Sequence, residues 1–174
     1  MEIHINNKMK YLIDRASAIT PKDSLDDLLK SKKSLRIKLG VDPTAPDVTL
    51  GWYAILRALR KFQDYGHTAV LILGEFTAQV GDPSGKSETR TQLKENQIDD
   101  NSKGVLPIIK NILNKENLEI VSNKDWLSKL STSELVHLSS STTLAQMLER
   151  DDFANRYKEG NPISLMEFFY PLFQ

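Results

Sequence analysis

Apolar residues near the amino end of the chain recur every three to four positions, which is the spacing of an amphipathic helix. Over 7–19 this face includes Leu12 and Ile13, and Pro21 ends the run. Over 21–34 the leucines share one face, with acidic residues early and lysines late, as the helix dipole favours. The pattern predicts two N-terminal helices.

The following segment alternates between strand and helix patterns. Residues 35–41 alternate apolar and basic side chains, and the loop "DPTAPD" comes next. Residues 50–65 return to helical spacing, and Gly66 is placed to cap that helix. The helical face consists of Ile55, Leu59 and Phe62. The run "HTAVLILGEF", 67–76, reads as a strand buried on both faces of a parallel sheet. Together these elements predict a right-handed βαβ unit whose ligands bind beyond the carboxyl ends of the strands.

From residue 91 onward the pattern is mostly helical. Helical spacing recurs over 104–113 and 141–160, "LEIVS" indicates a short strand, and 162–174 is apolar enough for a buried helix. The fold class we predict is α/β. The chain ends on its most apolar segment after at most three strands, whereas parallel sheets usually have more, so we expect the fold to be unfinished.

Composition narrows the possible partners. The 174 residues carry 23 basic and 23 acidic side chains, so overall charge gives no case for nucleic-acid or membrane binding. No cysteine is present, which excludes a disulfide frame and a thiolate metal site. The three histidines are too far apart in sequence to suggest a metal site. No apolar run approaches the roughly 20 residues of a membrane helix, so we expect no membrane association.

Two loops hold candidate chemistry, and the first leads into the helix at residue 50. Its backbone N–H groups and the hydroxyls of Thr44 and Thr49 suit a phosphate group at a helix start. The alternative is that Asp47 or Thr49 only caps the helix.

The second loop is "VGDPSGKSETR", 80–90. Lys86 and Arg90 are four apart, so a helix beginning near Gly85 would present both cations to a polyphosphate. The spacing weakens a P-loop reading to a runner-up, because Gly81 and Gly85 enclose only three residues and Pro83 lacks an N–H. The alternative is a solvated surface turn.

Several long blocks of this sequence resemble the bacterial tyrosyl-tRNA synthetases, a family of class I aminoacyl-tRNA synthetases. The blocks are "KLGVDPTAPD", "KFQDYGHTAVLILGEFTAQVGDPSGKSETR", "MLERDDFANRYKEGNPIS" and "EFFYPLFQ". The resemblance implies the first half of a Rossmann-like parallel-sheet nucleotide-binding domain, with N-terminal helices and a helical connecting segment. It divides 1–174 into a βαβ half, 35–90, and the connecting segment, 91–174, without the C-terminal tRNA-binding domain. It also implies that tyrosine is activated with ATP, accompanied by Mg²⁺, to tyrosyl-adenylate for transfer to tRNA(Tyr).

The resemblance also assigns roles to individual positions. Asp42 is expected by the nucleotide, Thr44 at its terminal phosphates and Gly51 where adenine approaches the backbone. Lys86 and Arg90 match the cations that grip the departing pyrophosphate. The residues that match the group holding the α-amino group of tyrosine are Asp82, Tyr170 and Gln174.

Thr49 and Trp52 depart from the family pattern. They stand where the family has the two histidines of its nucleotide-binding signature, the first of which donates a hydrogen bond to the phosphates. Loss of one such donor typically costs about 2.7–4 kcal/mol of transition-state stabilisation. This favours a chain that is inactive or weakly active by itself. The alternatives are a non-catalytic binding module derived from the synthetase fold and a P-loop-like nucleotidase.

The resemblance finally suggests partners and a location. Relatives form homodimers through the segment that corresponds to 131–162, and they bind tRNA(Tyr) through C-terminal domains. A cytoplasmic enzyme is expected.

Overall fold

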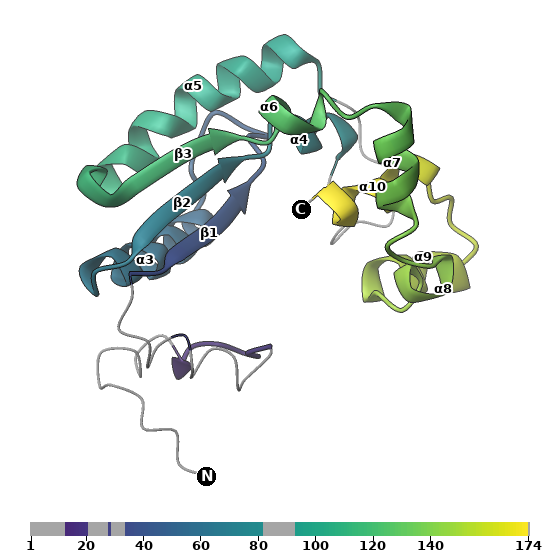
Figure 1. The fold of residues 1–174 in the computed structure, drawn as a ribbon, viewed down its shortest axis with the longest axis horizontal. Helices are drawn as coiled ribbons and strands as arrows, with labels where there is room; N and C mark the ends of the chain where they lie inside the picture. The colour runs from purple at the N-terminus through teal and green to yellow at the C-terminus, as the bar shows by residue number, and fades with distance from the viewer. Residues whose placement is uncertain (1–12, 21–27, 29–33, 82–92, 174) are drawn as a thin grey trace. The chain divides into compact units, whose positions relative to one another are not determined.

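The computed structural model describes residues 13–20, 28, 34–81 and 93–173. Its three strands form one sheet in the order β1-β2-β3, with all arrowheads in Figure 1 pointing the same way. The strands are β1 (Arg36–Val41), β2 (Thr68–Leu73) and β3 (Leu118–Ser122). The predicted parallel α/β fold is confirmed.

Helices connect the strands, and five further helices follow the last described strand. The connecting helices are α3 (Leu50–Asp64) between β1 and β2, and α4 (Thr77–Val80) with α5 (Glu95–Ile112) between β2 and β3. A 3₁₀ helix, η1 (Lys115–Asn117), leads into β3. The helices after β3 are α6 (Lys124–Leu127), α7 (Thr132–Ser139), α8 (Leu144–Met147), α9 (Asp151–Lys158) and α10 (Leu165–Phe173).

The chain forms two compact units, and the described residues of each are interleaved in sequence. The first unit contains residues up to Leu39 together with Val48–Leu71 and Pro107–Ile120. The second contains Gly40–Asp47, Ile72–Leu106 and the segment from Val121 onward. The carboxyl ends of all three strands therefore belong to the second unit.

Burial along the strands follows the sequence pattern. β1 alternates between exposed and half-buried positions, whereas Ala69, Val70 and Leu71 of β2 are buried. This is the central strand of the sheet, which explains its continuous apolar run. The predicted strand pair is confirmed.

Helix α3 ends where the sequence predicts, but its buried face differs from the predicted one. Gly66 has a φ of 92°, the left-handed conformation that follows many helix ends. Ile55 is exposed, and the buried positions are Leu56, Leu59 and Gln63. The side-chain amide of Gln63 donates to two backbone carbonyls and accepts from one backbone N–H, which offsets the cost of its burial.

Three other predictions about helices changed or remain open. The helix predicted over 7–19 is wrong at residues 14–19, where only turns and bends follow Ile13, and Ala16 bonds back to Ile13 instead. The helix predicted over 21–34 lies almost wholly outside the described residues. The helix predicted over 141–160 is two helices, because Arg150 is extended and pairs with Asp152 at the start of α9.

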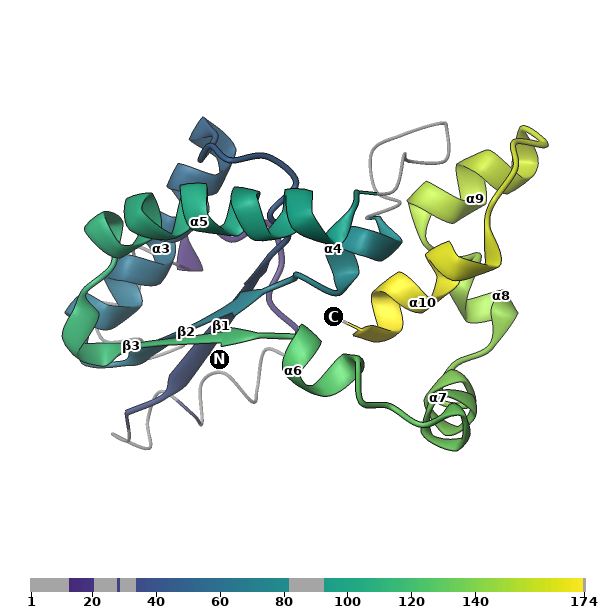
Figure 2. The same ribbon diagram turned by 90° about the horizontal axis from the view of Figure 1, so that it is seen from above.

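Within the second unit, α10 lies against α4, as both Figure 1 and Figure 2 show, and it also contacts α7. The rings of Phe153 in α9 and Phe168 in α10 lie 4.7 Å apart, which adds α9 to the same group. This packing brings the end of the chain near the segment that follows β2.

Candidate active site

The loop after β1 is anchored on α5. The side-chain amide of Asn101 donates to the Pro43 carbonyl at 2.9 Å. A Cβ atom on Gly104 would lie 2.6 Å from the carbonyl oxygen of Pro46, so only glycine permits this contact. Thr44 is exposed on the anchored loop, where its hydroxyl is accessible to a ligand.

The carboxylate of Asp42 accepts hydrogen bonds on both of its oxygens. The Thr77 hydroxyl donates to Oδ1 at 2.8 Å, and the Tyr170 hydroxyl donates to Oδ2 at 2.9 Å. Asp42 follows β1, Thr77 begins α4 and Tyr170 lies in α10, so three elements fix one carboxylate. Two donors hold its plane in a single orientation.

Asn123 extends this cluster to the third strand. It follows β3, and its Nδ2 donates to the hydroxyl oxygen of Thr77 at 2.9 Å. Its Oδ1 accepts from the backbone N–H of Phe76, also at 2.9 Å. Each of the three strands is therefore followed by a polar residue of one connected network, which we call the strand-end cluster: Asp42, Thr77, Asn123 and Tyr170.

Gly74 makes this close approach possible. A Cβ atom at this position would lie 1.8 Å from Oδ1 of Asp42 and 2.5 Å from the Thr77 hydroxyl oxygen. Both distances are far below van der Waals contact, so any larger residue would displace the carboxylate. The glycine at the end of β2 is thus part of the site.

The start of α3 shows that Thr49 caps the helix. Its side-chain oxygen accepts from the backbone N–H of Trp52 at 3.3 Å, so Thr49 is the N-cap and Asp47 is not. Trp52 is half-buried. Among the described residues, a Cβ atom on Gly51 would contact the Thr49 hydroxyl alone, at 3.8 Å, so these surroundings do not require glycine there.

Charged side chains around the strand ends are paired. The side-chain hydrogen bond between Lys124 and Glu95 raises the pKa of Lys124 and lowers that of Glu95. Ser122 donates to the carboxylate of Glu75. The contact between Lys124 and Glu95 is exposed, whereas that between Ser122 and Glu75 is partly buried.

Two classes of site find no support in the part of the chain that the structure describes. Within these residues, no three histidine or acidic side chains come close enough to hold a metal ion. None of the described helices has the length and apolar character needed to span a membrane.

The sequence-based site predictions can now be placed. Asp42 and Tyr170 are brought into direct contact, and Thr44 lies on the loop that Asp42 begins. The remaining predicted ligand-binding residues lie outside the described residues: Asp82, Lys86, Arg90 and Gln174.

The sequence predictions omitted Thr77, Asn123 and Gly74. All three follow or end a strand on the edge where ligands bind, so the strand-end rule could have identified them. Asn123 directly follows "LEIVS", and Gly74 directly follows β2.

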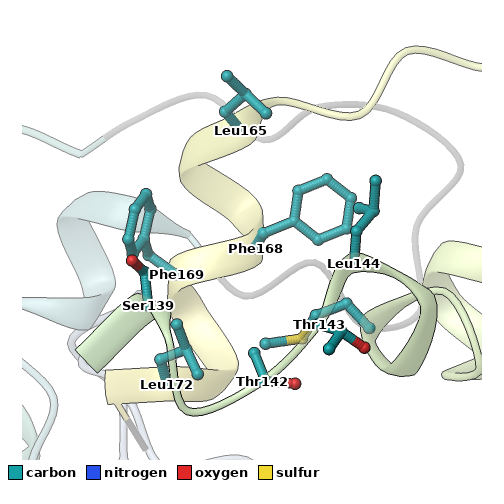
Figure 3. A pocket seen from close by; sticks show the side chains of 9 residues that line it. Ser139, Thr142, Thr143, Leu144, Leu165, Phe168, Phe169 and Leu172 are labelled. Atoms are coloured by element: carbon teal, nitrogen blue, oxygen red, sulfur yellow. The ribbon is translucent and has the colours of Figure 1, made fainter. Parts of the chain in front are cut away.

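An apolar groove lies elsewhere in the second unit. Its volume is about 280 Å³, and no charged residue lines it (Figure 3). Leu144 and Leu165 at its border are 63% and 79% exposed, so the groove continues into an exposed apolar surface. The lining residues are Ser139, Thr142, Thr143, Leu144, Met147, Leu165, Phe168, Phe169 and Leu172.

Comparison with known proteins gives a consistent result. The model of the class I tRNA synthetases (W and Y) matches residues 30–174. A tyrosine–tRNA ligase of Carboxydothermus hydrogenoformans is 48% identical over 98% of this chain and 42% of its own length. That of Moorella thermoacetica is 43% identical over all of this chain and 43% of its own length. The chain thus spans less than half the length of these relatives.

Solved structures agree with the sequence relatives. A C-terminally truncated mitochondrial tyrosyl-tRNA synthetase of Coccidioides posadasii matches with a TM-score of 0.77 and 25% identity, over 95% of this chain and 49% of its own. The tyrosyl-tRNA synthetase of Archaeoglobus fulgidus, complexed with L-tyrosine, shares the fold with a TM-score of 0.73 and 19% identity, over 96% and 49%. The predicted resemblance is confirmed, and the chain belongs to the class I tRNA synthetases of the W and Y family.

Proposed function

We propose that this chain supplies the tyrosine- and ATP-binding half of a tyrosine-activating site. The hydrogen bond between Tyr170 and Asp42 carries the proposal. It joins the residue expected at the amino acid to the residue expected at the nucleotide, beyond the carboxyl ends of three parallel strands. This is where ligands of open α/β sheets bind.

The chemistry needs the two substrates held in contact. A carboxylate oxygen of tyrosine attacks the α-phosphorus of ATP, the new O–P bond forms, and the bond to pyrophosphate breaks. The protein contributes mainly by positioning the reactants and stabilising charge on the phosphates. A phenolic oxygen both donates and accepts, so Tyr170 can donate to Asp42 and accept from the ammonium group of tyrosine. Asp82 and Gln174 are proposed as further partners of that group.

Phosphate contacts are proposed for three residues. Thr44 is exposed on its anchored loop, where it would contact the terminal phosphates. Lys86 and Arg90 would neutralise the departing pyrophosphate together with the Mg²⁺ that accompanies ATP. Gly51 would leave room for adenine, since, beyond its own turn of helix, the Thr49 hydroxyl at 3.8 Å is the one described atom that a Cβ there would contact.

The start of α3 limits this chemistry. The Thr49 hydroxyl already accepts the N–H of Trp52. Its hydrogen is the donor that remains for a phosphate, and the side chain is shorter than histidine. Trp52 adds a half-buried ring where the family has an imidazole. We therefore propose binding of both ligands with slow or no adenylate formation by this chain alone.

The first experiment measures L-tyrosine binding by isothermal titration calorimetry. Tyr170→Phe should weaken the affinity by about tenfold or more, which corresponds to the free energy of a hydrogen bond to a charged group. Tyr157→Phe is the matched control, because Tyr157 is 67% exposed on α9 and should leave affinity unchanged. Tyrosine binding that is absent, or that Tyr170→Phe leaves intact, would overturn the proposal.

The second experiment separates a slow enzyme from a binding module. ATP–pyrophosphate exchange is measured with the unmodified chain and with the double variant Thr49→His, Trp52→His. Exchange that rises in the double variant supports a weakened active site. Ligand binding without exchange in either protein supports the binding-module alternative, and ATP hydrolysis without any amino acid would indicate the P-loop-like nucleotidase.

The remaining partners follow from the family. Contact with tRNA(Tyr) is proposed only for a chain that carries the additional domains of the relatives. A homodimer is proposed through the segment 131–162, which contributes residues from Ser139 to Met147 to the apolar groove. A cytoplasmic location is proposed on the same resemblance.

A further inference from the structure

Asn123 is a buried asparagine, 3% exposed, whose side-chain oxygen and nitrogen atoms both take part in hydrogen bonds, one with the backbone of Phe76 and one with Thr77. The backbone N–H of Phe76 points at one of them at 2.9 Å. Because a backbone N–H can only donate, that atom is the oxygen of the amide. The amide nitrogen of Asn123 therefore faces the Thr77 hydroxyl as a donor, at 2.9 Å.

This arrangement determines the direction of the Thr77 hydroxyl. A hydroxyl has one hydrogen to donate. Since Asn123 donates to its oxygen, the hydrogen of Thr77 is directed to Oδ1 of Asp42 at 2.8 Å. Thr77 is completely buried, so water does not supply another acceptor. The direction of the whole chain of hydrogen bonds thus originates at the backbone N–H of Phe76.

We infer that Asn123 is a positioning residue, which holds the Asp42 carboxylate in its ligand-binding orientation through Thr77. The inference rests on the proposed function, and Asn123 itself touches neither ligand. Without its amide, the Thr77 hydroxyl loses its fixed direction, and Oδ1 of the carboxylate loses a fixed donor while Oδ2 still accepts from Tyr170. Rotation of the carboxylate then weakens the contact with the ligand.

The test measures the affinity for tyrosine and for ATP in the unmodified chain and in variants. Asn123→Ala and Thr77→Val should each weaken the affinity for the ligand that contacts Asp42, tyrosine or ATP, about fivefold. This corresponds to one neutral hydrogen bond. The two changes together should weaken it no further, because both break the same path. Thr77→Ser keeps the hydroxyl and should retain affinity, and Asn155→Ala, on the exposed side of α9, is the control.

Thermal unfolding of the same variants separates positioning from packing. A network that only stabilises the fold would lower the melting temperature of Asn123→Ala and leave the affinity of the folded fraction unchanged, which would overturn the inference. Additive losses of affinity in the double variant would also overturn it. If the unmodified chain bound neither ligand, the proposed function would fail and the positioning role with it. Binding that Asn123→Ala leaves unchanged would remove the positioning role alone.

Discussion

The Tyr170 hydroxyl donates a 2.9 Å hydrogen bond to Asp42, although 128 positions of sequence separate the two residues. Helix α10 is therefore tied directly to the end of the first strand. This hydrogen bond holds α10 in position, in addition to the ring contact of Phe173 with Phe76. Changes that disturb the carboxylate should consequently affect both stability and ligand binding.

Gly74→Ala tests how tightly the strand-end cluster is packed. The new methyl group would lie 1.8 Å from the Asp42 carboxylate, so the carboxylate must move and its bond to Thr77 must break. Overpacking of this kind typically costs about 1–3 kcal/mol. Chemical denaturation should show a loss in this range, and titration calorimetry should show weaker tyrosine binding. A variant of unchanged stability would show that the cluster is more loosely packed than the distances indicate.

Gly51→Ala is expected to have the opposite effect on stability. Within the part of the chain that the structure describes, its methyl group would contact the Thr49 hydroxyl at an ordinary 3.8 Å, and alanine favours a helix over glycine by up to about 1 kcal/mol. The variant should be as stable as the unmodified chain or slightly more stable, while its ATP affinity falls because the methyl group occupies space proposed for adenine. Calorimetric titration with a non-hydrolysable ATP analogue checks this. Unchanged ATP affinity would place the nucleotide elsewhere.

The βαβ unit could be predicted from the sequence because its signals are local. The alternation in β1, the continuous apolar run of β2 and Gly66 after α3 each report on their own environment. Thr49 shows the same property, since an N-cap bonds within its own turn. Such features depend on a few neighbouring residues, so they can be recognised in a single sequence.

The strand-end cluster could not be predicted from local patterns, because it consists of contacts between residues that are far apart in the sequence. Asn123 reads as an ordinary polar residue after a strand, and its role appears only when β3 lies beside β2. The break between α8 and α9 was missed because it depends on the pairing of Arg150 with Asp152, which competes with helical spacing. The predicted apolar helix includes a charged residue, Glu167. Its burial could not be foreseen, because it depends on the ion pair with Arg156 of α9.

The ion pair of Arg156 and Glu167 should be a major determinant of stability in the second unit. Their side chains are only 3% and 6% exposed, and Ser164 donates its backbone N–H to the same carboxylate at 3.0 Å. The hydrogen bond with Glu167 raises the pKa of Arg156, which keeps the guanidinium charged. Arg156→Met leaves a buried carboxylate without its cation and should cost about 3–5 kcal/mol.

Urea denaturation measures this loss. The double variant Arg156→Met, Glu167→Leu should recover a large part of it, because no buried charge remains. Lys103→Met, which removes the exposed partner of Asp100, is the control and should change stability little. A double variant that is as unstable as the single one would assign the loss to packing rather than to the unpaired charge.

The apolar groove should determine the association of two copies. Leu144 and Leu165 are its most exposed leucines, and a charge in either would oppose burial against another surface. Leu165→Asp should shift the chain from dimer to monomer in sedimentation velocity. Ile55→Asp alters a similarly exposed residue on α3 and should leave the distribution unchanged. A chain that is already monomeric at high concentration would contradict the proposed dimer.

Acidification should destabilise the first unit through His67. Its Nδ1 accepts the backbone N–H of Leu35 at 3.2 Å, which requires the neutral ring, and burial lowers the pKa of this histidine from 6.5. The unfolded chain therefore takes up the proton first, so this stabilisation is complete above pH 6.5 and is lost as pH falls toward the folded pKa. Carboxylates with lowered pKa, such as Glu134, lose their contribution to stability only below pH 4.5.

Thermal unfolding measured between pH 5 and 7 isolates the contribution of the histidine. His67→Asn, whose amide oxygen can accept the same N–H, should flatten the profile, whereas His137→Asn on the exposed side of α7 should retain it. Equal slopes in both variants would assign the acid sensitivity to another group.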